Sequence, residues 1–182
     1  MKRSQFLNLF TIAGVVTLVP YKAIANSKLF SRIKEGFMVL AGKDRNDKPL
    51  TIFGSDTFTT KVSTKDSNGD MFIFESVRMG KGGPSSHFHY EQDEWWYILE
   101  GEFEIIVGNS IYKAKAGDSV FGPRMVPHSF SKTSEGKGKL LITYQPAGKM
   151  EECFKLISGG ATKNFSKEQW NSFVKKYGFE NA

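Results

Sequence analysis

The chain has 182 residues, of which 40% are hydrophobic, 14% aromatic and 24% charged. This length allows one domain with a substantial buried core, and sixteen phenylalanines against six prolines argue against a disordered chain. The net charge is +6, or +3 without the three basic residues of positions 1–25, and this small excess is scattered without a basic stripe, which argues against a nucleic-acid partner.

The first 25 residues have the pattern of an export signal. Lys2 and Arg3 precede an apolar run from about residue 6 to 20, and Ala-Ile-Ala at residues 23–25 is a small-x-small cleavage pattern. The run is shorter than the roughly 20 residues of a bilayer span, so a signal peptide is favoured over an uncleaved anchor. We therefore expect a periplasmic or secreted protein that has no membrane attachment after cleavage.

Cys153 is the single cysteine of the chain. The mature protein therefore cannot contain an internal disulfide. An exported domain without a disulfide must be stabilised by its core or by another element such as a bound metal.

Residues 36–146 alternate short runs of β-branched and aromatic residues with turn-forming Gly, Asn and Pro. We expect strands over residues 37–41, 49–53, 57–63, 71–77, 94–100, 103–108, 110–116, 119–122, 128–133 and 140–145. Many short strands at this spacing are typical of an all-β sandwich or a small barrel.

Residues 147–182 have helical periodicity instead. Apolar residues at the i, i+3, i+4 and i+7 positions predict a first amphipathic helix over Met150, Cys153, Phe154 and Ile157. A second helix is predicted to begin at Ser166, where Gln169 would complete a capping box, and to end at Gly178. We expect both helices to pack on the outside of the β domain.

Two of the three histidines lie one residue apart. In an extended strand His87 and His89 face the same side, about 7 Å apart, so their imidazoles can converge on one ion. The polar residues 90–93 suit a turn that lets Glu94 face the two histidines. The strand that follows, residues 94–100, is apolar on both faces, so an ionised Glu94 needs a compensating charge, which a metal would supply.

The third histidine opens another predicted strand, on which His128, Phe130 and Lys132 face the same way. Trp96 shares a strand face with Glu94. We expect Trp96, Phe130 and Lys132 to line the pocket around the histidines.

These spacings resemble the two motifs of the cupin superfamily. The first motif ends in two histidines one residue apart, a glutamate and a glycine, and it is matched by His87, His89, Glu94 and Gly101. The second motif is matched by Gly117, Pro123 and His128. Met125 stands at the position of a motif glycine and Lys132 at that of a motif asparagine.

The resemblance implies a cupin-type double-stranded β-helix, or jelly-roll barrel, over residues 36–146, followed by short C-terminal helices in residues 147–182. It also implies a divalent first-row transition metal bound by His87, His89, Glu94 and His128. Because such a site keeps open positions, it suits Fe, Mn, Ni or Cu better than a closed structural zinc.

Several stretches are similar to quercetin-dioxygenase-like cupins, among them residues 78–108 and 120–130. Our first hypothesis is a metal-dependent dioxygenase that acts on a small enol, phenolic or diketone-like compound, with Glu94 as ligand and proton acceptor. The alternatives are a metal-dependent isomerase or lyase acting on a sugar or acid, and a non-catalytic cupin that binds a small molecule. A homodimer is expected, because the two-sided apolar strand over residues 95–99 would accommodate a partner.

Overall fold

The computed structural model describes residues 32–52, 54 and 56–182. The predicted signal peptide, residues 1–25, lies outside the described residues and stays a prediction. No helix among the described residues has both the length and the apolar character that crossing a membrane requires.

Within the described residues the chain forms eleven strands and two helices, which confirms the expected all-β domain with short C-terminal helices. The strands are β1 (Leu50–Ile52), β2 (Asp56–Val62), β3 (Phe72–Arg78), β4 (His87–His89), β5 (Asp93–Glu100), β6 (Glu102–Val107), β7 (Ser110–Lys115), β8 (Ser119–Gly122), β9 (His128–Lys132), β10 (Gly138–Gln145) and β11 (Phe179–Asn181). The helices are α1 (Met150–Ser158) and α2 (Lys167–Lys176).

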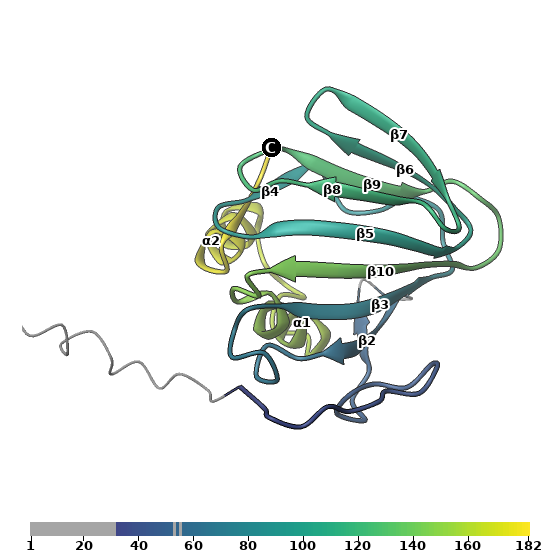
Figure 1. Ribbon diagram of the computed structural model, residues 1–182. Helices are drawn as coiled ribbons and strands as arrows, with labels where there is room; N and C mark the ends of the chain where they lie inside the picture. The colour runs from purple at the N-terminus through teal and green to yellow at the C-terminus, as the bar shows by residue number, and fades with distance from the viewer. Residues whose placement is uncertain (1–31, 53, 55) are drawn as a thin grey trace, which may run out of the picture.

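The strands form two antiparallel sheets that face each other as a double-stranded β-helix (Figure 1). One sheet has the order β1-β2-β3-β10-β5-β8, and the other has the order β11-β4-β9-β6-β7. Neighbours in each sheet come from distant parts of the chain. For example, β10 lies between β3 and β5, and β9 lies between β4 and β6.

Alternation of buried and partly exposed residues places the core between the two sheets. In β3 and β10 every second side chain is buried, beginning with Phe72 and Gly138 respectively. This period of two is what a strand with one buried face requires. The largest fully buried apolar side chains are Trp96, Phe72, Phe74, Phe103, Ile52, Ile98, Ile105, Leu140, Ile142 and Met150.

Residues 37–41 do not form the predicted strand. Met38 is 81% exposed and Leu40 58%, while the ring of Phe37 lies 3.9 Å from the guanidinium carbon of Arg45. An apolar run becomes a strand only where another strand offers hydrogen-bonding partners, and in the described structure none pairs with these residues.

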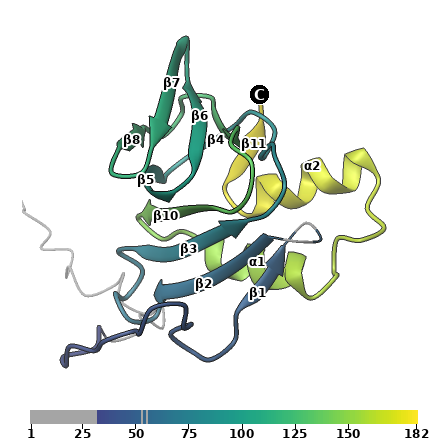
Figure 2. The ribbon, with the colours of Figure 1, turned by 90° about the vertical axis from the view of Figure 1, so that its right-hand side faces the viewer.

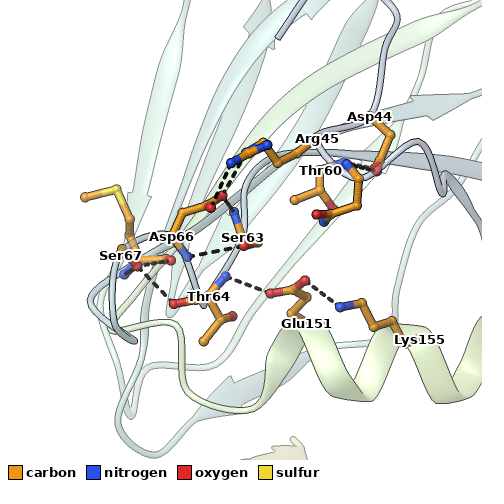
Figure 3. A network of polar contacts seen from close by, with 11 residues as sticks. Asp44, Arg45, Thr60, Ser63, Thr64, Asp66, Ser67, Glu151 and Lys155 are labelled. Carbon is orange, nitrogen blue, oxygen red and sulfur yellow. Dashed lines mark hydrogen bonds and ion pairs between the residues drawn. The ribbon is translucent and has the colours of Figure 1, made fainter. Parts of the chain in front are cut away.

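Acidic side chains attach the loops beside β2 to the rest of the domain (Figure 3). One carboxylate oxygen of Asp44 accepts a hydrogen bond from the N–H of Thr60 at 2.6 Å, and Asp66 pairs with Arg45 at 3.2 Å. Glu151 of α1 accepts a hydrogen bond from the N–H of Thr64 at 2.7 Å. This last contact joins the first helix to the turn between β2 and β3.

The two helices lie on one side of the β structure, with α2 beside β11 (Figure 2). The predicted capping box of α2 is present, since Ser166 accepts from the N–H of Gln169 and the Gln169 side chain accepts from the N–H of Ser166. Both helices were expected to pack on the outside of the β domain, and they contact it at the edges of the two sheets. Helix α1 contacts β1 at the edge of one sheet and α2 contacts β11 at the edge of the other, so the helices cover the open side between the sheets.

Strand β11 was not predicted from the sequence. It pairs with β4, with Phe179 opposite His89 and Asn181 opposite His87. Three residues carry too little periodicity to mark a strand, so only the tertiary contact with β4 defines it.

Cys153 gives a direct test of how tightly α1 packs. Its thiol is fully buried, and burial raises its pKa to about 12. Compared with an unfolded cysteine, whose pKa is about 8.5, the reactive thiolate is depleted on the order of a thousandfold in the native protein.

We therefore expect a thiol reagent at mildly alkaline pH to label the native protein far more slowly than the protein unfolded in guanidinium chloride. Because the chain has one cysteine, a single spectroscopic signal reports on this site. Rapid stoichiometric labelling of the native protein would show that α1 does not hold this position.

Candidate metal centre

Four buried side chains from three strands meet at one end of the space between the sheets. They are His87 and His89 of β4, Glu94 of β5 and His128 of β9. One potential ligand atom of each lies within 4.8 Å of those of the others. The structure thus brings together all four residues that the sequence predicted as metal ligands.

Strand register places these side chains. His87 is the register partner of His128, so two of the histidines face each other across adjacent strands. The chain turns between β4 and β5 at residues 90–92, and Glu94 emerges on the same side as the histidines. Phe88, between the two β4 histidines, points to the other face and is partly exposed.

The carboxylate of Glu94 is the centre of the cluster. Its Oε2 atom lies 3.2 Å from Nε2 of His128, 3.3 Å from Nε2 of His89 and 4.0 Å from Nε2 of His87. Glu94 is 1% exposed, so these imidazoles replace water as its neighbours. A buried ionised carboxylate without compensation would be strongly destabilising.

The backbone orients two of the three imidazoles. Nδ1 of His87 lies 2.9 Å from the carbonyl oxygen of Ser85, and Nδ1 of His128 lies 2.9 Å from that of Val126. A carbonyl oxygen only accepts hydrogen bonds, so each Nδ1 carries a proton and Nε2 is the atom that each ring presents to the cluster. Neither ring nitrogen of His89 makes a hydrogen bond.

The protonation states support the same arrangement. Burial lowers the pKa of His87 to about 4, although the charge of Glu94 acts in the opposite direction. Burial acts to raise the pKa of Glu94, but the adjacent imidazoles of His128 and His89 hold it below the usual range of a glutamate. A neutral His87 and an ionised Glu94 are the states in which these two side chains bind metals.

A cation fits this donor set. Imidazole lone pairs directed at a carboxylate oxygen repel it unless a positive charge lies between them, and His89 has buried nitrogens without a partner. Three imidazoles and one carboxylate are ligands that first-row transition metals accept. The buried cluster of His87, His89, Glu94 and His128 could therefore bind a metal.

A cavity of about 390 Å³ adjoins the cluster. Its walls come from both sheets and from the C-terminal segment, including Phe74 of β3, Phe130 of β9, Phe154 of α1 and Trp170 of α2. His87 and Glu94 reach the cavity surface. The cluster is thus open on one side to a space the size of a small organic molecule.

The predicted pocket residues have three different outcomes. Phe130 lines the cavity. Trp96 does not, because its fully buried ring packs 5.2 Å from the ring of His128 and fills the space beside Gly122. Lys132 is also a correction, because its ammonium donates hydrogen bonds to the carbonyl oxygens of Met79, at 3.0 Å, and Gly136, and so joins the end of β9 to two loops.

Two polar residues of the cavity wall were not predicted as site residues. Tyr144 is the register partner of Glu94, its ring lies 5.1 Å from that of His89, and burial together with the charge of Glu94 raises its pKa well above the usual value. Arg78 lies at the last inward position of β3. The strand alternation could have identified both, since Tyr144 follows Ile142 and Arg78 follows Ser76 on the buried face.

Met125 explains how one departure from the motif is accommodated. Its φ is 63°, a left-handed conformation that glycine adopts with less strain. Its N–H donates to the carbonyl oxygen of His89 at 2.8 Å. This bond holds the loop before β9 against β4, and so keeps His128 beside the other histidines.

Comparison with known proteins agrees with this architecture. The family model described as "Cupin domain" matches residues 73–144. An uncharacterized protein of Methanocaldococcus jannaschii is 32% identical over 60 residues, which are 33% of this chain and 48% of that protein, so the match spans about half of the relative.

One solved structure shows the same fold, and a second is reported for its sequence similarity. KdgF from a Halomonas species has a TM-score of 0.53 at 14% identity and covers 62% of this chain and 94% of its own. An RmlC-like cupin from Shewanella frigidimarina is 24% identical with a TM-score of 0.47, and the match covers 57% of this chain and 87% of that one. Two facing antiparallel sheets around an inward-facing cluster of three histidines and a glutamate define a β-barrel protein of the double-stranded β-helix type. The matching family model identifies a cupin domain over residues 73–144, and the described fold agrees with it.

Substitution of one ligand should lower metal content and stability together. We expect Glu94→Gln and His128→Ala to lose bound metal and to unfold at a lower temperature than the wild type. The physical reason is that a metal bound only to the native state at a hundred times its Kd adds about 2.7 kcal/mol to stability.

Elemental analysis and thermal unfolding measure the two effects. Glu100→Gln is a matched control, because Glu100 is at the other end of β5 with a side chain 44% exposed. A chelator should abolish most of the stability difference between wild type and Glu94→Gln. Equal metal content in the variants and the wild type would refute the ligand assignment.

Proposed function

We propose that this cupin is a metal-dependent dioxygenase that acts on a small enol, phenolic or diketone-like compound. The observation that carries the proposal is the opening of the buried cluster, through His87 and Glu94, into the 390 Å³ cavity. A purely structural metal site would be closed by its ligands. Here a ligand-sized space lies directly against the donor atoms.

The four ligands would hold a first-row transition metal that supplies Lewis acidity and redox chemistry. The protein itself provides the surroundings. Glu94 presents a carboxylate that can accept a proton from an acidic substrate oxygen. Phe74 and Phe130 offer flat apolar surfaces for a conjugated compound, and the buried walls keep bulk water away from it.

Tyr144 would assist in orienting the substrate. Its phenol stays neutral because burial and the neighbouring Glu94 raise its pKa, so it remains a hydrogen-bond donor at the cavity wall. A donor beside an acceptor suits a compound that exchanges between a ketone and an enol. The apolar walls suit such a compound better than a sugar with many hydroxyl groups.

The second candidate is a metal-dependent isomerase or lyase that acts on a small acid without O₂. The presence of Arg78 in the same cavity favours this alternative, because a guanidinium can bind a carboxylate. The two candidates differ in whether turnover consumes O₂.

Oxygen consumption tests the first candidate. We expect protein reconstituted with Fe, Mn, Ni or Cu to take up O₂ when mixed with a panel of flavonols, catechols and β-diketones, and Glu94→Gln to abolish the uptake. An oxygen electrode measures the rate. No uptake with any of these metals would refute the dioxygenase, and turnover under argon would establish the second candidate.

We also propose that the protein forms a homodimer through the outer face of β5 and β8. Trp95 of β5 is the register partner of Phe121 of β8, which is 57% exposed, and Leu99 on the same strand face is 41% exposed. A second copy would remove this apolar surface from water.

We expect sedimentation to show a dimer that Phe121→Glu converts to a monomer, because the carboxylate would be desolvated in the interface. Met38→Glu is the control, since Met38 is 81% exposed in a segment away from this face. A monomeric wild type would rule out the dimer.

A further inference from the structure

A second charged group lies in the cavity, away from the metal-ligand cluster. Arg78 is the last residue of β3 and Phe72 is the first. Phe72 is the register partner of Tyr144, which is the register partner of Glu94, so the Phe72 end of β3 is the end at the level of Glu94. The guanidinium carbon of Arg78 lies 5.2 Å from the centre of the Phe130 ring. Phe130 is the next inward residue after His128, about 7 Å further along β9.

Arg78 is buried with part of its hydrogen-bonding capacity unused. Its side chain is 11% exposed, and its Nη2 forms an ion pair at 2.8 Å with Oδ2 of Asp56, whose side chain is 7% exposed. The Nε atom is buried and has no hydrogen-bond partner. A guanidinium presents five N–H donors in a planar fork, so contact with one carboxylate oxygen leaves donors available.

The charges around Arg78 favour an anion. Burial acts to raise the pKa of Asp56, and two cations, Arg78 and Lys132, lie close enough to act in the opposite direction. Asp56 can neutralise only one of these two positive charges. With a divalent metal bound at the cluster, the total positive charge of this region would exceed the negative charge of Asp56 and Glu94. An incoming carboxylate would offset the excess.

Apolar residues separate the two charged ends. Phe74, Phe130 and Ile142 line the cavity between Arg78 and the cluster. A ligand that reaches both ends therefore needs a flat or apolar middle.

We propose that Arg78 binds a carboxylate of the substrate, which makes the substrate a small acid. Its enol, phenol or diketone oxygens would face His87 and Glu94, its apolar body would lie against Phe74 and Phe130, and its carboxylate would accept hydrogen bonds from Arg78. The assignment of the oxygen end rests on the proposed function, whereas the carboxylate end rests on Arg78 alone.

A matched pair of probes tests the carboxylate end. The acid is 3-(3,4-dihydroxyphenyl)propanoate and the neutral analogue is its methyl ester. Isothermal titration calorimetry on both metal-free and metal-loaded protein should show the acid binding about tenfold to a hundredfold more tightly than the ester, as a charge-assisted hydrogen-bonded pair allows. Equal affinities, or no binding of the acid to either form, would overturn the proposal.

Substitution of Arg78 should remove the preference. We expect Arg78→Gln to bind acid and ester equally, and Arg78→Lys to restore only part of the preference because an ammonium lacks the planar fork. Arg45→Gln is the control, since Arg45 also pairs with an aspartate, Asp66, but does not line this cavity. Retention of the full preference in Arg78→Gln would overturn the assignment.

A second variant covers the case in which Arg78→Gln does not fold, since that change leaves Asp56 buried without its partner. Asp56→Asn keeps Arg78 and removes the competing carboxylate, so we expect it to bind the acid at least about threefold more tightly while its affinity for the ester is unchanged. An unchanged affinity for the acid would mean that Arg78 serves only to pair with Asp56, which would contradict the proposal.

The metal-free titrations separate this proposal from the proposed function. If metal-loaded protein consumes no O₂ but metal-free protein still prefers the acid through Arg78, the dioxygenase is refuted and the carboxylate site stands. If O₂ is consumed with neutral substrates and the acid has no advantage, the dioxygenase stands and the carboxylate site is refuted.

Discussion

The carboxylate of Glu94, buried among three imidazoles, is the interaction on which the rest of the site depends. A carboxylate that is 1% exposed is tolerated only where positive charge or hydrogen-bond donors compensate it. Backbone carbonyls hold the Nδ1 protons of His87 and His128, so their Nε2 lone pairs are directed toward the same point as the carboxylate. A cation at this point would compensate the carboxylate charge and bind the imidazole nitrogens. The cluster is therefore buried in the same interior as the apolar core.

The two sheets and the C-terminal segment contribute different residues to the surroundings of that cluster. Strands β4, β5 and β9 supply the candidate metal ligands, while β3 and β10 supply apolar wall residues and the polar residues Arg78 and Tyr144. Residues of α1, α2 and β11 also line the cavity, and both helices lie on one side of the β structure (Figure 2). The residues that follow β10 are therefore part of the cavity wall as well as of the core.

Much of the fold followed from local patterns. Strands β3, β5, β9 and β10 were predictable because one face of each is buried, and alternation of apolar residues reports that burial directly. The same pattern was misleading for residues 37–41, where apolar residues have no strand to pair with. Lys132 also faces inward as expected, but its long side chain reaches the carbonyl oxygens of Met79 and Gly136 instead of the cavity, a choice that depends on loops distant in sequence.

The sequence by itself determined the all-β character of the domain, the capped second helix and the four candidate ligands, because strand period, capping chemistry and motif spacing are local properties of the chain. Only the tertiary structure decided what surrounds those ligands. The pairing of β11 with β4, the placement of α1 over the open side, and the position of Arg78 beside Phe130 all join residues that are far apart along the chain. Such contacts arise from packing and long-range strand pairing, which no local window of the sequence records.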